Sequence, residues 1–322
     1  LHRCLLAGRA NAGHAQLSRK SRSARNPRLR YSGDMFYRPG TILAAVFLAS
    51  LAAATLAETL RPLRRRVEPR LRRAARNFTA GGISLAAVTL LQTPLLAPIS
   101  AWTTRQGFGV LNALRLPRAA ATVLGVLLLD YTLWHWHRIN HRVPFFWRFH
   151  LVHHVDLDMD ATTGVRFHFG EMALSVVWRA VQVVLIGPSA AAIWIYQSLL
   201  FASVLFHHSN TRLPIWLERI LVRIVVTPRM HGIHHSDWKN ETDSNWSSLL
   251  SVWDYLHRTA VLSIPQSRVE IGVPAYRRAE DVTLPRLLAM PFLRQRADWT
   301  LPDGSPRIVR PDARQTAAIL AP

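Results

Sequence analysis

The sequence predicts an all-α integral membrane protein, with about four membrane-crossing helices plus a helical hairpin and a cytoplasmic histidine-rich helical cap. Three observations favour this fold class: long apolar blocks, arginine-rich segments beside them, and histidines gathered in short clusters. Of the 322 residues, 49% are hydrophobic and only 18% are charged. Ordinary soluble domains carry about a quarter charged residues, so the composition argues against a pair of soluble domains.

The apolar blocks have the length of membrane helices. The first covers about residues 41–60, the second about 79–101 and the third about 119–136. Each is close to the roughly 20 residues that cross the hydrocarbon core. Two further arms, about 171–186 and 189–206, are separated by a Gly-Pro pair that breaks a helix. We expect these arms to form a hairpin that crosses, or dips deeply, and returns.

Two basic segments orient the chain. Residues 1–34 and 61–77 each carry a net charge of +7, and together they supply most of the formal charge of +21. Arginines beside apolar spans favour the cytoplasmic side, so we expect residues 61–77 to form a cytoplasmic loop. If the chain crosses the membrane at each expected span and returns at the end of the two arms, all the histidine clusters lie on that cytoplasmic face. A bacterial inner membrane fits this arrangement. Nucleic-acid binding is disfavoured, because no aromatic and basic platform accompanies the charge.

The composition also divides the chain. Residues 1–34 are basic and poor in acids, and the first methionine is Met35. We expect this extension to be disordered or to precede the natural start, with a transit peptide as the alternative. The remaining divisions are N-terminal spans with the arginine-rich loop (35–118), a catalytic domain (119–260) and a cytoplasmic tail (261–322) that is weakly structured after about residue 300. Cys4 is the only cysteine, which excludes an intramolecular disulfide and fits a reducing compartment.

Three short clusters hold eight of the fifteen histidines: His137-x-x-x-His141, His150-x-x-His153-His154 and His231-x-x-His234-His235. Residues three and four apart share one face of a helix, so each cluster presents several imidazoles in one direction. A lone histidine on a helix is usually a packed or surface residue, but the repeated pattern is much harder to assign to chance. Neutral imidazole suits iron, copper, zinc and nickel. Zinc sites need only three or four ligands, so eight histidines indicate two metal ions.

The motifs around these clusters resemble those of the fatty acid hydroxylase / sterol desaturase superfamily over roughly residues 120–260. They are Asp130-x₆-His137-Arg-x-x-His141, His150-x-x-His153-His154, Phe206-x-His208-Ser209-Asn210, Thr227-Pro228-x-x-His231-x-x-His234-His235, Asn245 and Trp253-Asp254. The resemblance implies a membrane-embedded helical core with a cytosol-facing cap. It also implies a non-haem di-iron centre, dioxygen as the oxidant and hydroxylated or desaturated lipids or sterols as products.

The resemblance further implies which residues bind the metal. The expected ligands are His137, His141, His150, His153, His154, His208, His231, His234 and His235. His168 lies in an Arg-x-His segment and is expected to support the site rather than to bind metal, and His207 to be a neighbour. Metal-bound histidines usually donate their second N–H to a carboxylate or carbonyl, and the candidate acceptors are Asp130, Asn210, Asp237 and Asp254.

The function expected from this resemblance is oxidation of a lipid C–H bond. Its cofactor is two irons, which zinc can replace on purification, and its electrons come from a separate ferredoxin- or cytochrome-type protein. Two rival functions remain. A membrane zinc hydrolase needs a general base, commonly glutamate, yet no glutamate lies inside a histidine cluster. A non-catalytic metal-binding or transport protein would carry ionisable residues in several spans, whereas away from the span ends only Arg179 and Asp130 interrupt these.

Overall fold

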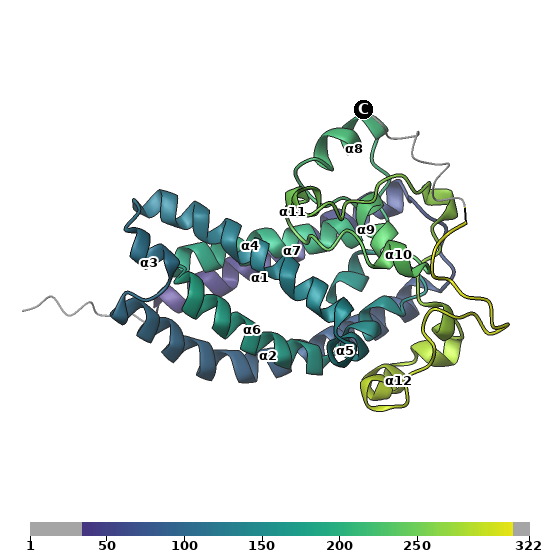
Figure 1. The fold of residues 1–322 in the computed structure, drawn as a ribbon, viewed down its shortest axis with the longest axis horizontal. Helices are drawn as coiled ribbons and strands as arrows, with labels where there is room; N and C mark the ends of the chain where they lie inside the picture. Colours follow the sequence, from purple (N-terminus) through teal and green to yellow (C-terminus); the bar gives the residue numbers. More distant parts are fainter. Residues whose placement is uncertain (1–33, 312–322) are drawn as a thin grey trace, which may run out of the picture.

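A computed structural model describes residues 34–311 and is built from helices alone (Figure 1). Within that range the only β pairing consists of isolated bridges. The long helices are α1 (Asp34–Leu60), α2 (Arg70–Gln106), α4 (Arg118–Arg142), α6 (Phe169–Ile186) and α7 (Ala190–His208). The short ones are α3 (Val110–Leu114), α5 (Pro144–His154), α8 (Ile215–Leu221), α9 (Pro228–His234), α10 (Lys239–Thr242), α11 (Val252–Leu256) and α12 (Leu284–Ala289), with 3₁₀ turns at 161–165, 266–268, 274–276, 279–282 and 290–292. The expected all-α fold class is confirmed.

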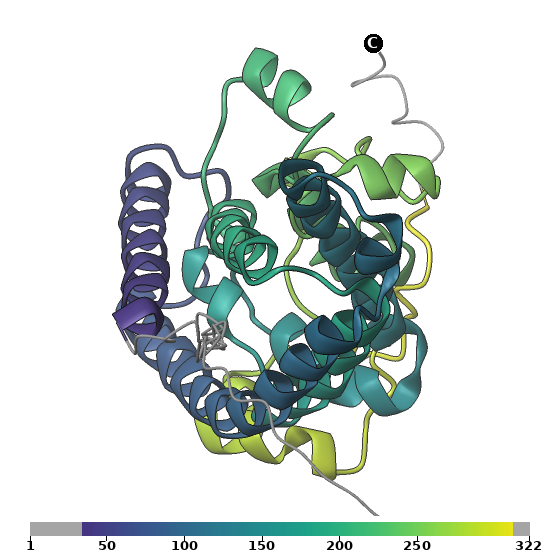
Figure 2. The same ribbon diagram turned by 90° about the vertical axis from the view of Figure 1, so that its left-hand side faces the viewer.

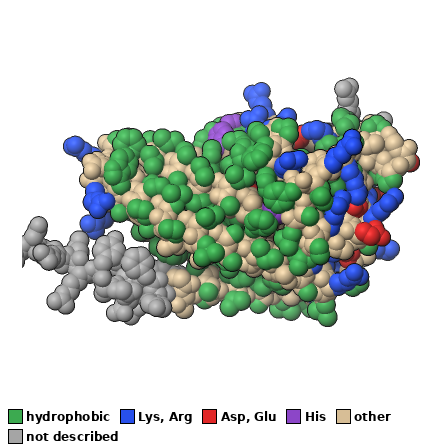
Figure 3. All heavy atoms as spheres, turned by 90° about the horizontal axis from the view of Figure 1, so that it is seen from below, with side chains coloured by type: hydrophobic (Ala, Val, Ile, Leu, Met, Phe, Trp, Pro, Cys, Tyr) green, Lys and Arg blue, Asp and Glu red, His purple; other side chains and the backbone are tan. Residues whose placement is uncertain are grey.

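The long helices form an apolar bundle with a polar cap at one end. Four helical segments are long and apolar enough to cross a membrane: Gly40–Leu60, Arg70–Leu114, Phe169–Ile186 and Ala190–His208. In the bundle α2 packs along α6 and α1 along α7, and α1 lies at one edge (Figure 2). Hydrophobic side chains cover the body, whereas charged side chains gather at the end that holds α9, α10 and α12 (Figure 3). The protein is therefore an integral membrane protein.

The expected spans are recovered with three differences. The two arms expected to form a hairpin are α6 and α7; both are long enough to span, and they pack mainly against α2 and α1 rather than against each other. The second span is longer than expected, because α2 begins at Arg70 and continues through Pro94 and Pro98. Membrane helices tolerate proline, since neighbouring groups satisfy the freed carbonyls. The third expected span, 119–136, forms the greater part of α4 but is not among the four apolar segments. Asp130 and His135 lie within it and lower its hydrophobicity.

The arginines of residues 61–77 do not all face a headgroup layer. Arg73 is 1% exposed, and its guanidinium forms ion pairs with Asp160 and, at 2.8 Å, with Asp156. Asp156 also accepts an ion pair at 2.9 Å from Arg166, which is fully buried. These residues come from α2, the turn after α5 and the segment before α6, so the network joins three elements around one carboxylate. A buried charge without its partner is costly, which makes Asp156 the centre of this junction.

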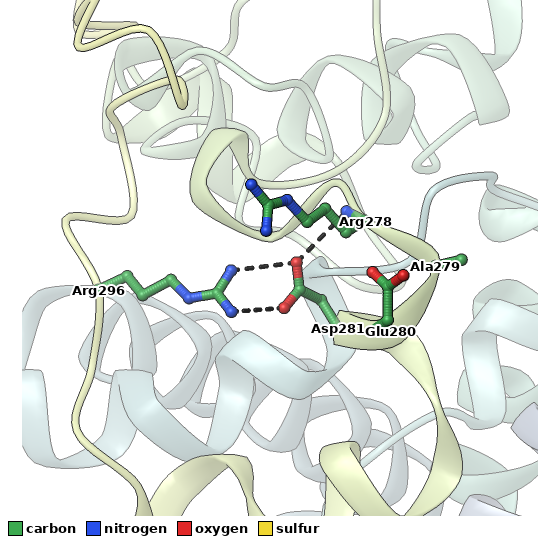
Figure 4. Close-up of a pocket in the computed structure, with 5 residues that line it drawn as sticks. All are labelled: Arg278, Ala279, Glu280, Asp281 and Arg296. Carbon is green, nitrogen blue, oxygen red and sulfur yellow. Dashed lines mark hydrogen bonds and ion pairs between the residues drawn. The ribbon is translucent and has the colours of Figure 1, made fainter.

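The C-terminal segment is more ordered than the expected tail. Val273, Tyr276, Val282, Leu287 and Met290 pack into the same buried cluster as Leu151, Val152 and Val155. A bidentate ion pair between Arg296 and Asp281 lines the surface pocket shown in Figure 4. Near the end of the described residues, Arg310 bonds to the buried Glu241 of α10. The end expected to be weakly structured after about residue 300 is described only to residue 311, and residues 300–311 form turns, bends and an isolated bridge. The expectation for residues 1–33 lies outside the described residues.

Replacing Asp156 with Asn should destabilise the protein by ~3–5 kcal/mol, because Arg73 and Arg166 would keep their buried charges without a carboxylate. Thermal unfolding in neutral detergent measures the effect. Asp303→Asn is the matched control, since Asp303 is exposed in the C-terminal segment. Equal unfolding temperatures for the two variants would contradict a stabilising role for the Asp156 network.

Candidate metal centre

Four elements of the cap end carry the nine expected ligand histidines. The last turns of α4 carry His137 and His141, and α5 carries the His150 cluster. The end of α7 supplies His208, and α9 with the residue after it supplies the His231 cluster. Two prolines set the short helices: α5 begins at Pro144 and α9 at Pro228, where fixed φ and a missing N–H suit the first helical position. The short helices therefore start where the sequence dictates and present their histidines inward.

The nine histidines form two groups in which the candidate ligand atoms lie within 4.8 Å of one another. One group contains His137, His141, His150, His154 and His234, and the other contains His153, His208, His231 and His235. Adjacent histidines point to different groups: His153 and His154 separate, and so do His234 and His235. Successive helical residues are rotated by about 100°, so each His-His pair bridges the two groups.

Backbone carbonyls fix the orientation of four rings. The Nδ1 atoms of His137, His153, His208 and His234 lie 2.7, 3.1, 2.8 and 2.7 Å from the carbonyl oxygens of Trp246, Arg166, Val204 and Ser244. A carbonyl only accepts hydrogen bonds, so each Nδ1 must carry the proton and donate. The Nε2 atom of each ring therefore carries a lone pair. In the fifth oriented ring, His150 Nδ1 lies 2.9 Å from the Glu171 carboxylate.

These lone pairs face one another. His153 Nε2 lies 3.1 Å from His208 Nε2, and both atoms are acceptors by the assignment above. His231 Nε2 lies 3.0 Å from His208 Nε2 and 3.2 Å from His235 Nε2. Two acceptors at this distance repel unless a cation lies between them. The second group thus has the donor set and the convergence of a metal site.

The first group shows the same property through unpaired atoms. The Nε2 atoms of His141, His150, His154 and His234 are buried and have no hydrogen-bond partner among residues 34–311. An unpaired buried polar atom costs about 1–3 kcal/mol, and four in one place indicate a missing partner that accepts lone pairs. The residues present fit a metal ion in each group.

Burial also keeps the imidazoles neutral. Removal from water lowers the pKa of His234 to about 3, even though the Ser244 carbonyl acts in the opposite direction. Burial, reinforced by the neighbouring histidines, holds the pKa values of His153, His154, His231 and His235 well below the usual value of 6.5. A metal requires neutral imidazole, so these rings are ready to bind at neutral pH.

None of the four residues expected to accept a hydrogen bond from a ligand histidine has such a bond; each has other partners. Asp130 accepts from Trp253 Nε1 at 2.7 Å and from the Leu250 amide at 3.1 Å, because α11 and the preceding chain cover that face of α4. Both polar ends of the Asn210 side chain bond to the backbone of Arg64. Asp237 faces Arg277 and Arg307 at 3.9 and 3.7 Å.

Asp254 was expected to accept directly from a ligand histidine, but it supports one indirectly, through the backbone. It accepts from the backbone amides of Trp246 and Ser247 at 3.0 and 2.9 Å, and so fixes the carbonyl that receives the His137 proton. Asp254 therefore positions His137 through the backbone.

His168 and His207 lie outside both groups. His168 Nδ1 accepts from the Gly170 amide at 2.9 Å and caps α6, and its Nε2 lies 3.1 Å from the Leu288 carbonyl. Both nitrogens are thus occupied, and the ring serves the helix start. His207 packs 4.1 Å from the His231 ring, as expected of a neighbour.

Glu171 is the carboxylate that sequence reasoning missed. It lies in the first turn of α6, is 4% exposed and bonds His150 at Nδ1. Its signal was the single acidic residue at the entry of an apolar span, where a charge needs a reason. Asp243 is a second carboxylate on this side, 3.9 Å from His141 Nδ1.

Glu171→Gln should lower metal affinity by about 10- to 100-fold, because a neutral amide accepts the His150 proton more weakly than a carboxylate does. A competition titration against a chelator measures this. Glu280→Gln is the matched control, since Glu280 is exposed on the C-terminal segment. If the two variants bind metal equally well, Glu171 does not support the centre.

Acidification should destabilise the metal-free protein. The folded-state pKa of His234 is about 3, whereas the unfolded chain takes up protons near 6.5. The unfolded state therefore binds more protons below pH 6.5, and stability falls as the pH drops from there toward 3. Unfolding temperatures between about pH 7.5 and 5.5 test this, and a flat profile would contradict it.

Comparison with known proteins agrees with this geometry. Residues 122–259 match the family described as fatty acid hydroxylase. The ornithine lipid hydroxylase OlsE of Rhizobium tropici is 27% identical over 234 residues, covering 71% of this chain and 70% of that protein. Alkylglycerol monooxygenases of Xenopus tropicalis and Homo sapiens are 29% and 26% identical, covering 44% and 41% of this chain but only 30% and 28% of their own length.

No solved structure matches the chain. The family match spans all nine histidines of the two groups. The match assigns residues 122–259 of this chain to a fatty acid hydroxylase domain, and the similarity to the ornithine lipid hydroxylase extends beyond it.

Proposed function

We propose that this protein is a membrane-bound di-iron oxygenase that inserts oxygen into a C–H bond of a lipid. The observation that carries the proposal is the pair of adjacent histidine groups, whose Nε2 lone pairs converge without partners. The relatives are named as a lipid hydroxylase and as monooxygenases, which favours hydroxylation over desaturation. The overall reaction consumes dioxygen, two electrons and two protons, and yields the hydroxylated lipid and water.

The protein's contribution is to hold and orient nine neutral donors away from water. His137, His141, His150, His154 and His234 would hold one iron, and His153, His208, His231 and His235 the other. Bound iron would supply the redox chemistry with dioxygen that zinc lacks. The carbonyls and Glu171 that fix the Nδ1 atoms keep each Nε2 aimed inward, which preorganises the site.

The zinc hydrolase alternative is less well supported. It requires a carboxylate base beside the metal-bound water. Glu171 and Asp243 both approach the histidines at Nδ1, the edge away from the proposed metals. Zinc bound in place of iron during purification would be resolved by anaerobic reconstitution with iron.

Location and partners follow from the charge and the family. The arginine-rich connection between α1 and α2 favours the cytoplasmic side for the histidine groups, in a bacterial inner membrane. Among the described residues the two histidine groups are the only clusters of candidate metal ligands, and we propose that electrons come from a separate ferredoxin- or cytochrome-type protein. The lipid substrate would enter from the bilayer.

His153→Ala and His234→Ala, one from each group, should each lose iron and abolish lipid oxidation. Purified wild-type protein should contain about two irons per chain by mass spectrometry. His135→Ala is the matched control, because His135 lies on α4 beside His137 but outside both groups. Iron content and activity retained in both cluster variants would sink the di-iron assignment.

A further inference from the structure

A second cavity, separate from the histidine groups, lies at the cap end. Its volume is about 1020 Å³, and its walls come from the loop after α1, the chain before α8, the start of α9 and residues 262–271. No histidine of the two groups lines it. Five arginines do: Arg64, Arg65, Arg212, Arg229 and Arg277.

The positive charge of this cavity is largely uncompensated. Of the two acids in its walls, Asp158 is bonded to the amides of Val67 and Glu68, and Glu270 faces Arg277 at 3.4 Å. Of the other four arginines, only Arg229 has an acid within ion-pair distance in residues 34–311, and that acid, Glu218, is 3.8 Å away. Several guanidinium groups around one space with so few carboxylates form a site for an anion.

Arg64 is held rigidly in the inner wall. Asn210 bonds its backbone N–H and carbonyl, both at 2.8 Å. Its Nη2 donates to the Pro228 carbonyl at 2.9 Å and to Gln266 Oε1 at 2.6 Å. The guanidinium lies directly on Gly232, where a Cβ atom would approach Nη2 to 1.6 Å. Glycine between His231 and Ile233 is therefore required for Arg64 to reach this position, and a fixed cation costs little entropy on binding.

The surroundings of the cavity indicate the depth of the lipid headgroups. α8 stands away from the bundle (Figure 1), and its first residue, Ile215, lines the cavity. This helix exposes Ile215, Trp216 and Ile220 by 44, 65 and 53%. Exposed apolar and tryptophan side chains beside arginines are typical of a segment in the membrane interface. Ile215 also lines the cavity, together with apolar residues that include Leu63, Met159 and Leu262. The space thus offers cations for a charged head and apolar walls for the adjoining chain.

We propose that this cavity binds the anionic headgroup of a membrane lipid, with Arg64, Arg65, Arg212 and Arg229 contacting its phosphate or carboxylate oxygens. The site needs no metal, so it stands or falls independently of the oxygenase assignment.

The test is calorimetric titration of the full metal-free chain in neutral detergent with dioctanoyl phosphatidic acid, dioctanoylglycerol and inorganic phosphate. Phosphatidic acid should bind, and the Arg212→Gln/Arg229→Gln variant should bind it at least about tenfold more weakly, because two charge-assisted contacts are lost. The matched control is Arg219→Gln, an exposed arginine of α8 outside the cavity, which should bind like the wild type.

Three results would overturn the proposal. Dioctanoylglycerol binding as tightly as phosphatidic acid would exclude recognition of the anionic head. Inorganic phosphate binding as tightly would exclude a lipid site. Unchanged affinity in the double variant would exclude these arginines. If that variant does not fold, Arg65→Gln/Arg212→Gln replaces two exposed side chains of the same cavity and gives the same readings.

Discussion

The structure depends on nine buried imidazoles that must remain neutral and whose lone pairs point at one another. No arrangement of hydrogen bonds satisfies His153 Nε2 and His208 Nε2 at 3.1 Å once their Nδ1 protons are committed to carbonyls. The facing lone pairs repel each other unless a cation lies between them, so we expect metal binding to raise the free energy of unfolding. Metal binding and folding stability are coupled through the same atoms.

The surrounding elements make this convergence possible. The second N–H of each oriented ring is received by a carbonyl or by Glu171, and Asp254 fixes the carbonyl that serves His137. On the opposite side, Arg166 links the centre to the buried ion network: its carbonyl receives the His153 proton while its guanidinium pairs with Asp156. The arginine-rich connection thus has a structural role in addition to any part in orientation, because Arg73 completes the same network.

The arginine-lined cavity is also linked to the metal centre, through Arg64 in its wall. Arg64 touches Gly232, in the middle of the His231 cluster, and is held by Asn210, two residues after His208. One arginine therefore joins a wall of the proposed headgroup site to two of the segments that carry the histidines. While Arg64 keeps this position, the contact leaves no room for a Cβ atom at Gly232.

The sequence by itself determined the membrane class, the apolar helices on either side of Gly187-Pro188 and the histidines of the three clusters, because apolar length and helical spacing are local properties. His208 was expected from the family resemblance alone. Tertiary structure alone decided how the nine histidines divide into two groups, since that depends on how α4, α5, α7 and α9 pack. It also decided the acceptors. Asp130 and Asn210 have the expected residue type, yet they form hydrogen bonds with Trp253 and Arg64 instead of with ligand histidines. Glu171 lies opposite His150 only because of how α6 packs in the bundle. The packing of residues 273–290 onto α5 could likewise not be predicted from the sequence. The Pro-rich, charged composition of that segment hides a few apolar side chains whose partners are set only by the tertiary structure.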